Sequence, residues 1–562
     1  MFIAEHNLPF LVLDHLSNLL ISVCSDSEIA RGIHCSRKKG TNYCTQITGP
    51  ENFNIVANDL KQQWFSLIID ESTDVSTTKC LAVVARYFKE EKVSDQYLGL
   101  IQTQDATAEG IFCSIKSLLE KNNIGLSKLV GFAADNASVM QGNFRGVQAR
   151  FKQEVPDIFV LGCTCHSLAL CSSAACRKLP ASVECLARDI VNYFAHSSKR
   201  KDELKECQEF VNLKPHKLLK LCQVRWLSMQ DVVNRILQQW PALILFFTNE
   251  TNDNGKGNIN NPGAILEAKQ NPIFKLYFSF LSYVLDIINK INIEFQSEAP
   301  RIHLLHSRLN SLYTTLLKNF MKRDYIYNTS YSNIKFLPCN YKELNDIYCG
   351  ATCEQIVSNN ISINKTDLNA FKIKVLDFYK ELAKQIQNRF DFDDPVLKFL
   401  KNVDPAVVVS GECESLVPIA SRFPRLVTNL EQLNSEWRLL PDIPELKNRA
   451  NHNLDKFWSY IFNLKNGVNE YMFPNLTTFM KGILCLPHSS ATVERTFSQL
   501  TLIKTKNRNR LQIETCNALL HTKALLNGQK CYEFVPSVSL LKKNFDTNNN
   551  RDVNDEIEDL TF

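Results

Sequence analysis

Two short apolar runs in this chain each end in an aspartate. Asp70 follows the run at residues 64–69, and Asp135 follows the run at residues 129–134. Strand-forming residues followed at once by an acid predict buried strands that bring carboxylates to one edge of a sheet. Carboxylate oxygens suit hard divalent cations, and two such ions can clamp the attacking and leaving oxygens of a phosphoryl transfer. The alternative is that each acid only caps the segment after it.

The region around these runs alternates between strand and helix patterns. Strands are expected at residues 65–70, 81–88, 96–101, 129–134 and 158–162, and helices at residues 110–121, 138–153 and 167–176. Three early strands separated by short polar turns predict an antiparallel meander. The later order of helix, strand and helix predicts crossover connections. The pattern therefore predicts an α/β fold for this region.

Helical patterns dominate the rest of the chain. The first 50 residues have apolar side chains at helical spacing, and the chain is helix-rich from residue 229 to about residue 480. Polar loops at residues 252–258 and 325–367 interrupt this long stretch. Two compact helices are expected near the end, at residues 491–503 and 511–526. The acidic end beyond them is expected to be a disordered tail.

Composition excludes several classes of protein. The net charge of +5 is small for 562 residues, so nucleic-acid binding would have to use local patches. The best membrane-span candidate, residues 274–295, contains Lys275, Asp286 and Lys290 and is expected to be an amphipathic helix. The N-terminus lacks the basic segment of a secretion signal. The 19 cysteines are therefore expected to be reduced thiols in the cytosol or nucleus.

Two short motifs follow the last expected strand. Cys163 and His166 form a Cys-x-x-His pair, which can begin a zinc site. No second pair follows at finger spacing, so a buried thiol beside a hydrogen-bonded histidine is the expected state. Arg225 precedes Trp226. Such a pair is usually a core indole with a charged neighbour, and the alternative is a platform on which an unstacked base lies.

A polar motif begins the first of the two terminal helices. Ser490 or Thr492 is expected to cap this helix, which puts Glu494 in its first turn. A glutamate there is usually a partner of the helix dipole, and a catalytic role is the alternative. Four cations lie between the two helices, and they either form a solvated turn or hold DNA phosphates. They are Lys504, Lys506, Arg508 and Arg510.

In their order, these motifs resemble the hAT superfamily of DNA transposases and the host proteins derived from them. The resemblance extends from Ala4 to about Leu526. The motifs that carry it are Asp70-Glu71-Ser72-Thr73, Ala134-Asp135-Asn136, Cys163-x-x-His166, Arg225-Trp226 and Ser490-x-x-x-Glu494-Arg495-x-Phe497-Ser498. No single motif is specific, but the ordered set is.

The resemblance implies a ribonuclease H-like catalytic core interrupted by a large all-helical insertion. The implied regions are a helical N-terminal region at residues 1–55, the first part of the core at 56–228, the insertion at 229–485, the core completion with a C-terminal dimerisation region at 486–528, and a disordered acidic tail at 529–562.

The resemblance also implies roles for single residues. Asp70, Asp135 and Glu494 would be a DDE triad that binds two Mg²⁺ or Mn²⁺ ions for DNA strand cleavage and transfer. Trp226 would stack on a base displaced at a DNA hairpin, and Arg225 and the four cations would contact DNA. The terminal helices would dimerise through Phe497, Leu500, Leu511, Leu519 and Leu520.

Two functions remain open at this point. The first is a transposase-like enzyme that acts on DNA. The second is a non-enzymatic, domesticated nuclear protein that dimerises and binds DNA or chromatin partners. Family transposases commonly carry a zinc-binding BED finger before the core, and the residues before Ala4 do not supply one. This departure favours the second function, whereas retention of all three acids favours the first. Neither function involves a membrane or a small-molecule substrate.

Overall fold

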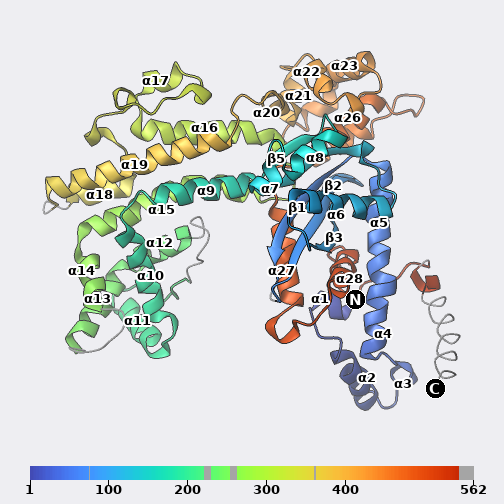
Figure 1. The fold of residues 1–562 in the computed structure, drawn as a ribbon, viewed down its shortest axis with the longest axis horizontal. Coiled ribbons are helices and arrows are strands. Elements are labelled where there is room, and N and C mark those ends of the chain that lie inside the picture. The colour runs from blue at the N-terminus through green and yellow to red at the C-terminus, as the bar shows by residue number, and fades with distance from the viewer. Residues whose placement is uncertain (75, 220–228, 254–261, 360–362, 539, 544–562) are drawn as a thin grey trace. The chain divides into compact units, whose positions relative to one another are not determined.

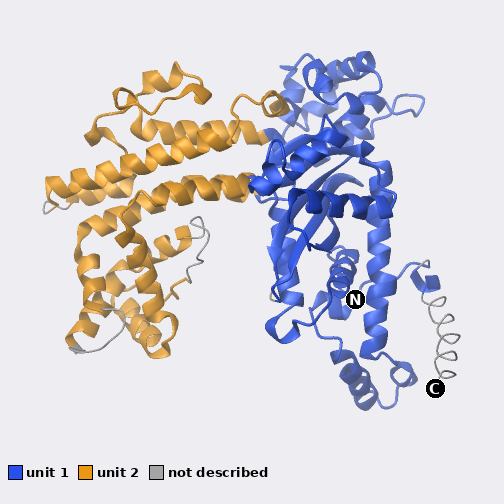
Figure 2. Cartoon of the chain, in the orientation of Figure 1, with its two compact units in different colours: residues 1–163, 296–303, 402–562 blue, residues 164–295, 304–401 orange. Residues whose placement is uncertain are grey.

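The computed structural model describes residues 1–74, 76–219, 229–253, 262–359, 363–538 and 540–543. The chain divides into two compact units, which Figure 2 shows in different colours. Unit 1 consists of residues 1–163, 296–303 and 402–562. Unit 2 consists of residues 164–295 and 304–401.

Unit 1 contains a mixed five-stranded sheet in the order β3-β2-β1-β4-β5 (Figure 1). The strands are β1 Phe65–Thr73, β2 Lys79–Lys89, β3 Lys92–Gln102, β4 Leu129–Ala134 and β5 Phe159–Gly162. β1 to β3 pair antiparallel, whereas β4 pairs parallel with both β1 and β5. The predicted mixed α/β fold, with its meander and its crossovers, is confirmed.

Helices cover both faces of this sheet, so its central strands are buried on both sides. On one face, Phe132 of β4 packs on Phe151 of α8 (Val147–Glu154), with ring centroids 4.9 Å apart. On the other face, a core cluster joins Ile68 and Ala133 to Val493 of α27 (Ala491–Ile503) and to the buried side of α28 (Ile513–Leu525). The last helices of unit 1 therefore complete the core of a sheet formed early in the chain.

One predicted helix is divided in two. The pattern at residues 138–153 forms α7 (Ser138–Gln141) and α8, with a turn between them. Gly142 and Gly146 approach each other so closely in this turn that a Cβ atom on Gly146 would lie 2.4 Å from the backbone nitrogen of Gly142. Only glycine fits there, and the helical periodicity did not reveal this turn.

The N-terminal segment of unit 1 is helical. It forms α1 (Phe2–Glu5), α2 (Val12–Val23), α3 (Glu28–Gly32), α4 (Arg37–Asn42), a π-helical stretch at Tyr43–Thr48 and α5 (Gly49–Gln62). Ile3 and Ala4 are buried and join the cluster beneath α27 and α28. The crossover before β4 is formed by α6 (Ala108–Lys121).

Unit 2 is helical in all its described residues apart from loops and short turns. Its longer helices are α9 (Thr164–Cys176), α10 (Ala181–Ala195), α11 (Ser198–Phe210), α12 (Met229–Gln238), α13 (Trp240–Asp253), α14 (Pro262–Gln270), α15 (Pro272–Phe295), α16 (Ile302–Phe320), α18 (Ala351–Asn359) and α19 (Lys365–Arg389). No helix among the described residues combines the length and the apolar composition needed to cross a membrane.

The boundary of the helical region differs from the expected one. Unit 2 starts at Thr164 rather than at residue 229 and ends at Lys401 rather than at residue 485. The helices after it belong to unit 1, namely α21 (Pro405–Ser410), α22 (Val417–Arg422), α23 (Leu430–Leu439), α24 (Pro444–Lys447), α25 (Leu454–Phe462) and α26 (Pro474–Leu484). Arg425 helps to fix them there, because its guanidinium pairs with Asp157 at 2.6 Å and donates to the carbonyl oxygen of Leu129 at 2.8 Å.

Candidate functional site

Strand register brings Asp70 and Asp135 close together. Ile68 of β1 lies opposite Ala133 of β4; Asp70 comes two residues later on β1, and Asp135 is the first residue after β4. Side chains two residues apart on a strand point to the same face. Ile68 belongs to the cluster that contains Val493, so Asp70 extends from the face that α27 covers, and Asp135 is close enough for its charge to act on Asp70.

Glu494 comes to the same face from the other end of the chain. It lies in the first turn of α27, as expected, and α27 contacts β1 and β2. Burial raises the pKa of the Asp70 carboxyl to about 7, and the charges of Asp135 and Glu494 add to this rise, whereas the backbone N–H of Glu71 opposes it. The structure thus gathers three carboxylates within electrostatic reach of one another.

The alternative capping role is also visible at these acids. Asp135 accepts a hydrogen bond from the backbone N–H of Ala137 at 3.2 Å, and Asp70 accepts one from Glu71 at 3.0 Å. Each carboxylate has a second oxygen, so a capping bond leaves acceptor capacity for a cation. The three acids do not form a set whose ligand oxygens all lie within 4.8 Å of one another. A pair of ions roughly 3.5–4 Å apart can connect carboxylates that are farther apart than one ion could.

Cys163 lies close to Asp70 and to the turn that contains Asp135. Its side chain is fully buried, its backbone N–H donates to the carbonyl oxygen of Ala134 at 2.9 Å, and its own carbonyl oxygen accepts from Asn136 at 3.1 Å. The backbone N–H of Ser490 points to its sulfur at 3.5 Å. The expected buried thiol is therefore present, and it connects β5, the Asp135 turn and the start of α27.

The expected partner of this thiol belongs to the other unit. His166 is half-buried in the first turn of α9 in unit 2. Within the described ranges, neither Cys163 nor His166 belongs to a group of three metal-binding side chains.

The predicted cap of α27 is wrong in its mechanism. Ser490 is the N-cap residue, but its side chain makes no capping hydrogen bond. The hydroxyl of Thr492 instead bonds to Asp95 of β3. The sequence motif predicted a capping bond within the helix, whereas the hydroxyl of Thr492 is used in a contact with a distant strand.

The predicted phosphate-binding cations separate into two kinds. Lys504 is buried and forms an ion pair with Asp74 at 2.6 Å, so its assignment as a DNA contact is wrong. Arg508 is half-buried against Phe10 and donates to the carbonyl oxygen of Asn7 at 3.4 Å. Lys506 and Arg510 are exposed. The segment is therefore partly structural, because it fastens the end of α27 to the N-terminal region.

Arg225 and Trp226 lie outside the described residues, so their predicted contacts with DNA stay predictions.

A group with mixed ligand types lies elsewhere on unit 1. In the described part of the chain, one set of three side chains has its potential ligand atoms all within 4.8 Å: Glu5, His6 and Cys531. Glu5 already accepts from the backbone N–H of Cys531 at 2.9 Å and lies 3.6 Å from Lys530. The three side chains therefore connect α1 to the segment that follows α28.

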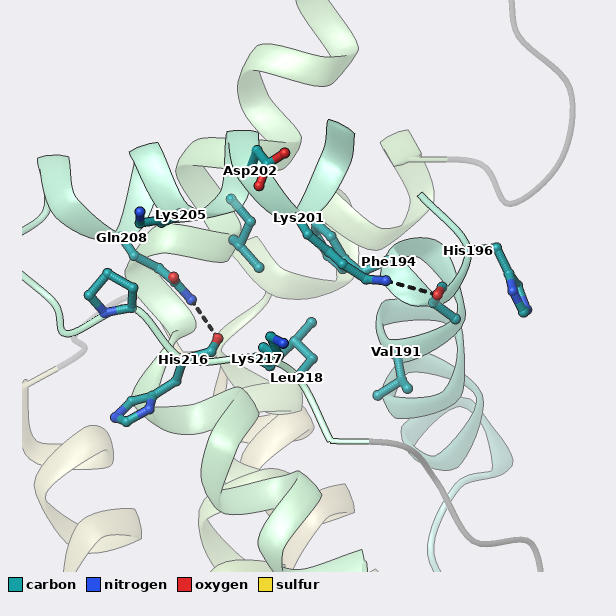
Figure 3. A pocket seen from close by; sticks show the side chains of 13 residues that line it. Val191, Phe194, His196, Lys201, Asp202, Lys205, Gln208, His216, Lys217 and Leu218 are labelled. Atoms are coloured by element: carbon teal, nitrogen blue, oxygen red, sulfur yellow. Dashed lines mark hydrogen bonds between the residues drawn. The ribbon is translucent and has the colours of Figure 1, made fainter. Parts of the chain in front are cut away.

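Unit 2 contains a cavity of about 510 Å³ next to α10 and α11 (Figure 3). Lys201 donates to the carbonyl oxygen of Ala195 at 3.0 Å, and Gln208 donates to that of His216 at 3.0 Å. The lining has apolar and cationic members, including Val191, Phe194, Leu204, Lys205 and Lys217. None of the predicted site residues that the structure describes lines it.

Two regions of the chain match known family models. A family model described as the hAT family C-terminal dimerisation region matches residues 430–526. This part of the chain is therefore similar to the dimerisation region of hAT proteins. A second model, described as a ZMYM1/FAM200 RNase-like domain, matches residues 41–146, which include β1 to β4 and both aspartates.

A curated relative of this chain is "General transcription factor II-I repeat domain-containing protein 2" of Bos taurus. The two are 25% identical over 193 residues, which is 33% of this chain and 20% of the relative. The match thus covers a fifth of the relative's length.

The match to a dimerisation region supports self-association of this protein. The side chains predicted to form the interface are mostly in the core of the single chain, however. Leu500, Leu519 and Leu520 are buried against the protein's own sheet, and Phe497 and Leu511 pack on the same cluster. Assigning the three buried leucines to a dimer surface is therefore wrong. Their helical spacing revealed an apolar face but not what covers it.

Proposed function

We propose that this protein is hAT transposase-like and that Asp70, Asp135 and Glu494 hold Mg²⁺ or Mn²⁺ for cleavage and transfer of DNA strands. The proposed architecture is a ribonuclease H-like core, formed by the sheet and completed by α27 and α28, with a helical insertion in the middle of the chain. The proposed site of action is the nucleus. The observation that carries the proposal is the gathering of three sequence-distant acids, with the pKa of Asp70 raised to about 7.

The donor set fits a divalent cation. Carboxylates that lie close together at a partly buried site repel one another, which destabilises the fold, and a bound cation would offset this repulsion. Oxygen ligands suit Mg²⁺ and Mn²⁺ in particular. When bound, such ions would supply Lewis acidity and activation of the attacking hydroxyl. The protein's own residues would orient the acids, since β1, β4 and α27 are rigid elements fixed by a shared core.

Cation binding to the whole chain tests this proposal. Titration of Mn²⁺ should show binding to the unsubstituted protein, and Asp70→Asn, Asp135→Asn or Glu494→Gln should each weaken it by more than about 10-fold. Glu120→Gln, which neutralises an exposed acid on α6, is the matched control. Equal binding by the unsubstituted protein and all three site variants would refute the metal assignment. Mn²⁺-dependent nicking of a labelled DNA duplex then tests the catalytic step.

One observation favours the alternative function. Lys504 is buried and Arg508 is half-buried against this protein's own residues, which leaves two fully exposed cations in the segment predicted to hold DNA phosphates. A domesticated, non-enzymatic nuclear protein would not need more cations than these two in this segment. Self-association and DNA binding without Mn²⁺-dependent nicking would identify that function.

A further inference from the structure

The helix that carries Glu494 begins without a local cap. Ser490 makes no side-chain capping bond, so the first turn of α27 depends on contacts with distant segments. Val493 holds one side of this turn, because its side chain is fully buried against the sheet. Polar contacts from Thr492 and Arg495 hold the remaining sides.

A buried ion pair in the sheet holds Thr492. The hydroxyl of Thr492 hydrogen-bonds to one oxygen of Asp95, and the other oxygen accepts from Arg86 at 2.7 Å. The side chains of Arg86 and Asp95 are 1% and 3% exposed. Removing either partner would leave the other charge buried and uncompensated, so each side chain holds the other in place between β2 and β3.

Residues 296–303, a short segment of unit 1, hold the other side of the first turn of α27. Arg495 donates to the carbonyl oxygen of Gln296 at 2.9 Å and forms an ion pair with Glu298 at 3.0 Å. Arg495 also donates to the hydroxyl of Thr492 at 2.8 Å. The carbonyl oxygen of Glu298 in turn accepts from Arg86 at 3.1 Å, which closes the ring of contacts.

We propose that Thr492, Arg495 and Asp95 are positioning residues that fix the direction of Glu494 toward the two aspartates. This inference rests on the proposed metal-binding function. Residues 492, 493 and 495 surround Glu494 within one helical turn, and each is tied to a different part of unit 1. Because the position of this turn is fixed, the geometry of the helix fixes the direction in which the side chain of Glu494 leaves it.

Two substitutions at Thr492 separate positioning from simple stability. Thr492→Val removes the hydroxyl at nearly constant volume, whereas Thr492→Ser keeps it. Thr492→Val should weaken Mn²⁺ binding by about 10-fold, the lower end for groups that orient metal ligands, and Thr492→Ser should restore it. Thr501→Val is the matched control, because Thr501 is exposed on the same helix and its hydroxyl bonds only to Phe497 of that helix.

Arg495→Gln provides a second test on a partly exposed side chain, whose loss a folded chain tolerates better. It should also weaken Mn²⁺ binding while the circular dichroism spectrum stays unchanged. Variants that bind Mn²⁺ like the unsubstituted chain, when Glu494→Gln does not, would overturn the positioning role and leave the proposed function intact. Equal binding by the unsubstituted chain and Glu494→Gln would instead refute the proposed function, and the positioning role with it.

Discussion

At the scale of single residues, the structure replaces a predicted DNA contact with a buried ion pair. Burial alone would raise the pKa of Asp74, but hydrogen bonds from Lys504 and from the backbone N–H groups of Thr78 and Ser76 outweigh it and lower that pKa. The pair connects the turn after β1 to the end of α27, with the two side chains 3% and 5% exposed.

Asp74→Asn should therefore destabilise unit 1 in a pH-dependent way. At pH 7 the variant leaves Lys504 buried without its counter-charge, at a cost of about 3–5 kcal/mol. The carboxylate's contribution is complete above its unfolded pKa of about 3.9 and is lost as the pH falls through the lower folded value. Denaturant unfolding at pH 7 and pH 3 should thus show a large difference between variant and unsubstituted chain at pH 7 and a smaller one at pH 3. A difference independent of pH would contradict this account.

At the scale of elements, α27 and α28 belong to the core of the chain rather than to a free surface. Leu519→Ala should lower stability by about 2–5 kcal/mol, because it leaves a cavity beside the sheet. Leu502→Ala on α27, whose side chain is 57% exposed, should change stability by less than about 0.5 kcal/mol. Thermal melting of both variants checks this, and equal effects would show that α28 does not pack as described.

The elements also show what the sequence could predict. Strand runs and helical periodicity located β1 to β5, α27 and α28, because burial imposes these periods directly. Asp70 and Asp135 were found because each follows an apolar run, and Glu494 because it lies in the first turn of a helix; β1 nevertheless continues past Asp70 to Thr73. The ion pair of Arg86 and Asp95 was missed, although an arginine within a buried strand is a visible signal. The cap of α27 and the position of Lys504 depend on residues hundreds of positions away, which local patterns do not contain.

At the scale of the whole molecule, self-association must use surface other than the buried leucines. Within the dimerisation region, Val468 and Tyr471 are 74% and 57% exposed, which is unusual for large apolar side chains close together in sequence. The full chain should have a light-scattering mass of about twice 64.3 kDa. Replacing Val468 and Tyr471 with glutamate should shift it toward the monomer mass without changing the melting temperature. A mass unaffected by the double substitution would exclude this surface.

The late position of α27 and α28 in the chain has a consequence for synthesis. The strand face of Ile68 and Ala133 leaves the ribosome early, and 491 − 134 = 357 positions separate the end of β4 from the start of α27. During that interval the part of the sheet face that α27 and α28 cover stays open, and folding that depends on such distant contacts is slow. We therefore expect the nascent chain to be prone to aggregation until its last helices emerge. A chain stopped at residue 485 should accumulate as aggregate even though every strand of the sheet is present.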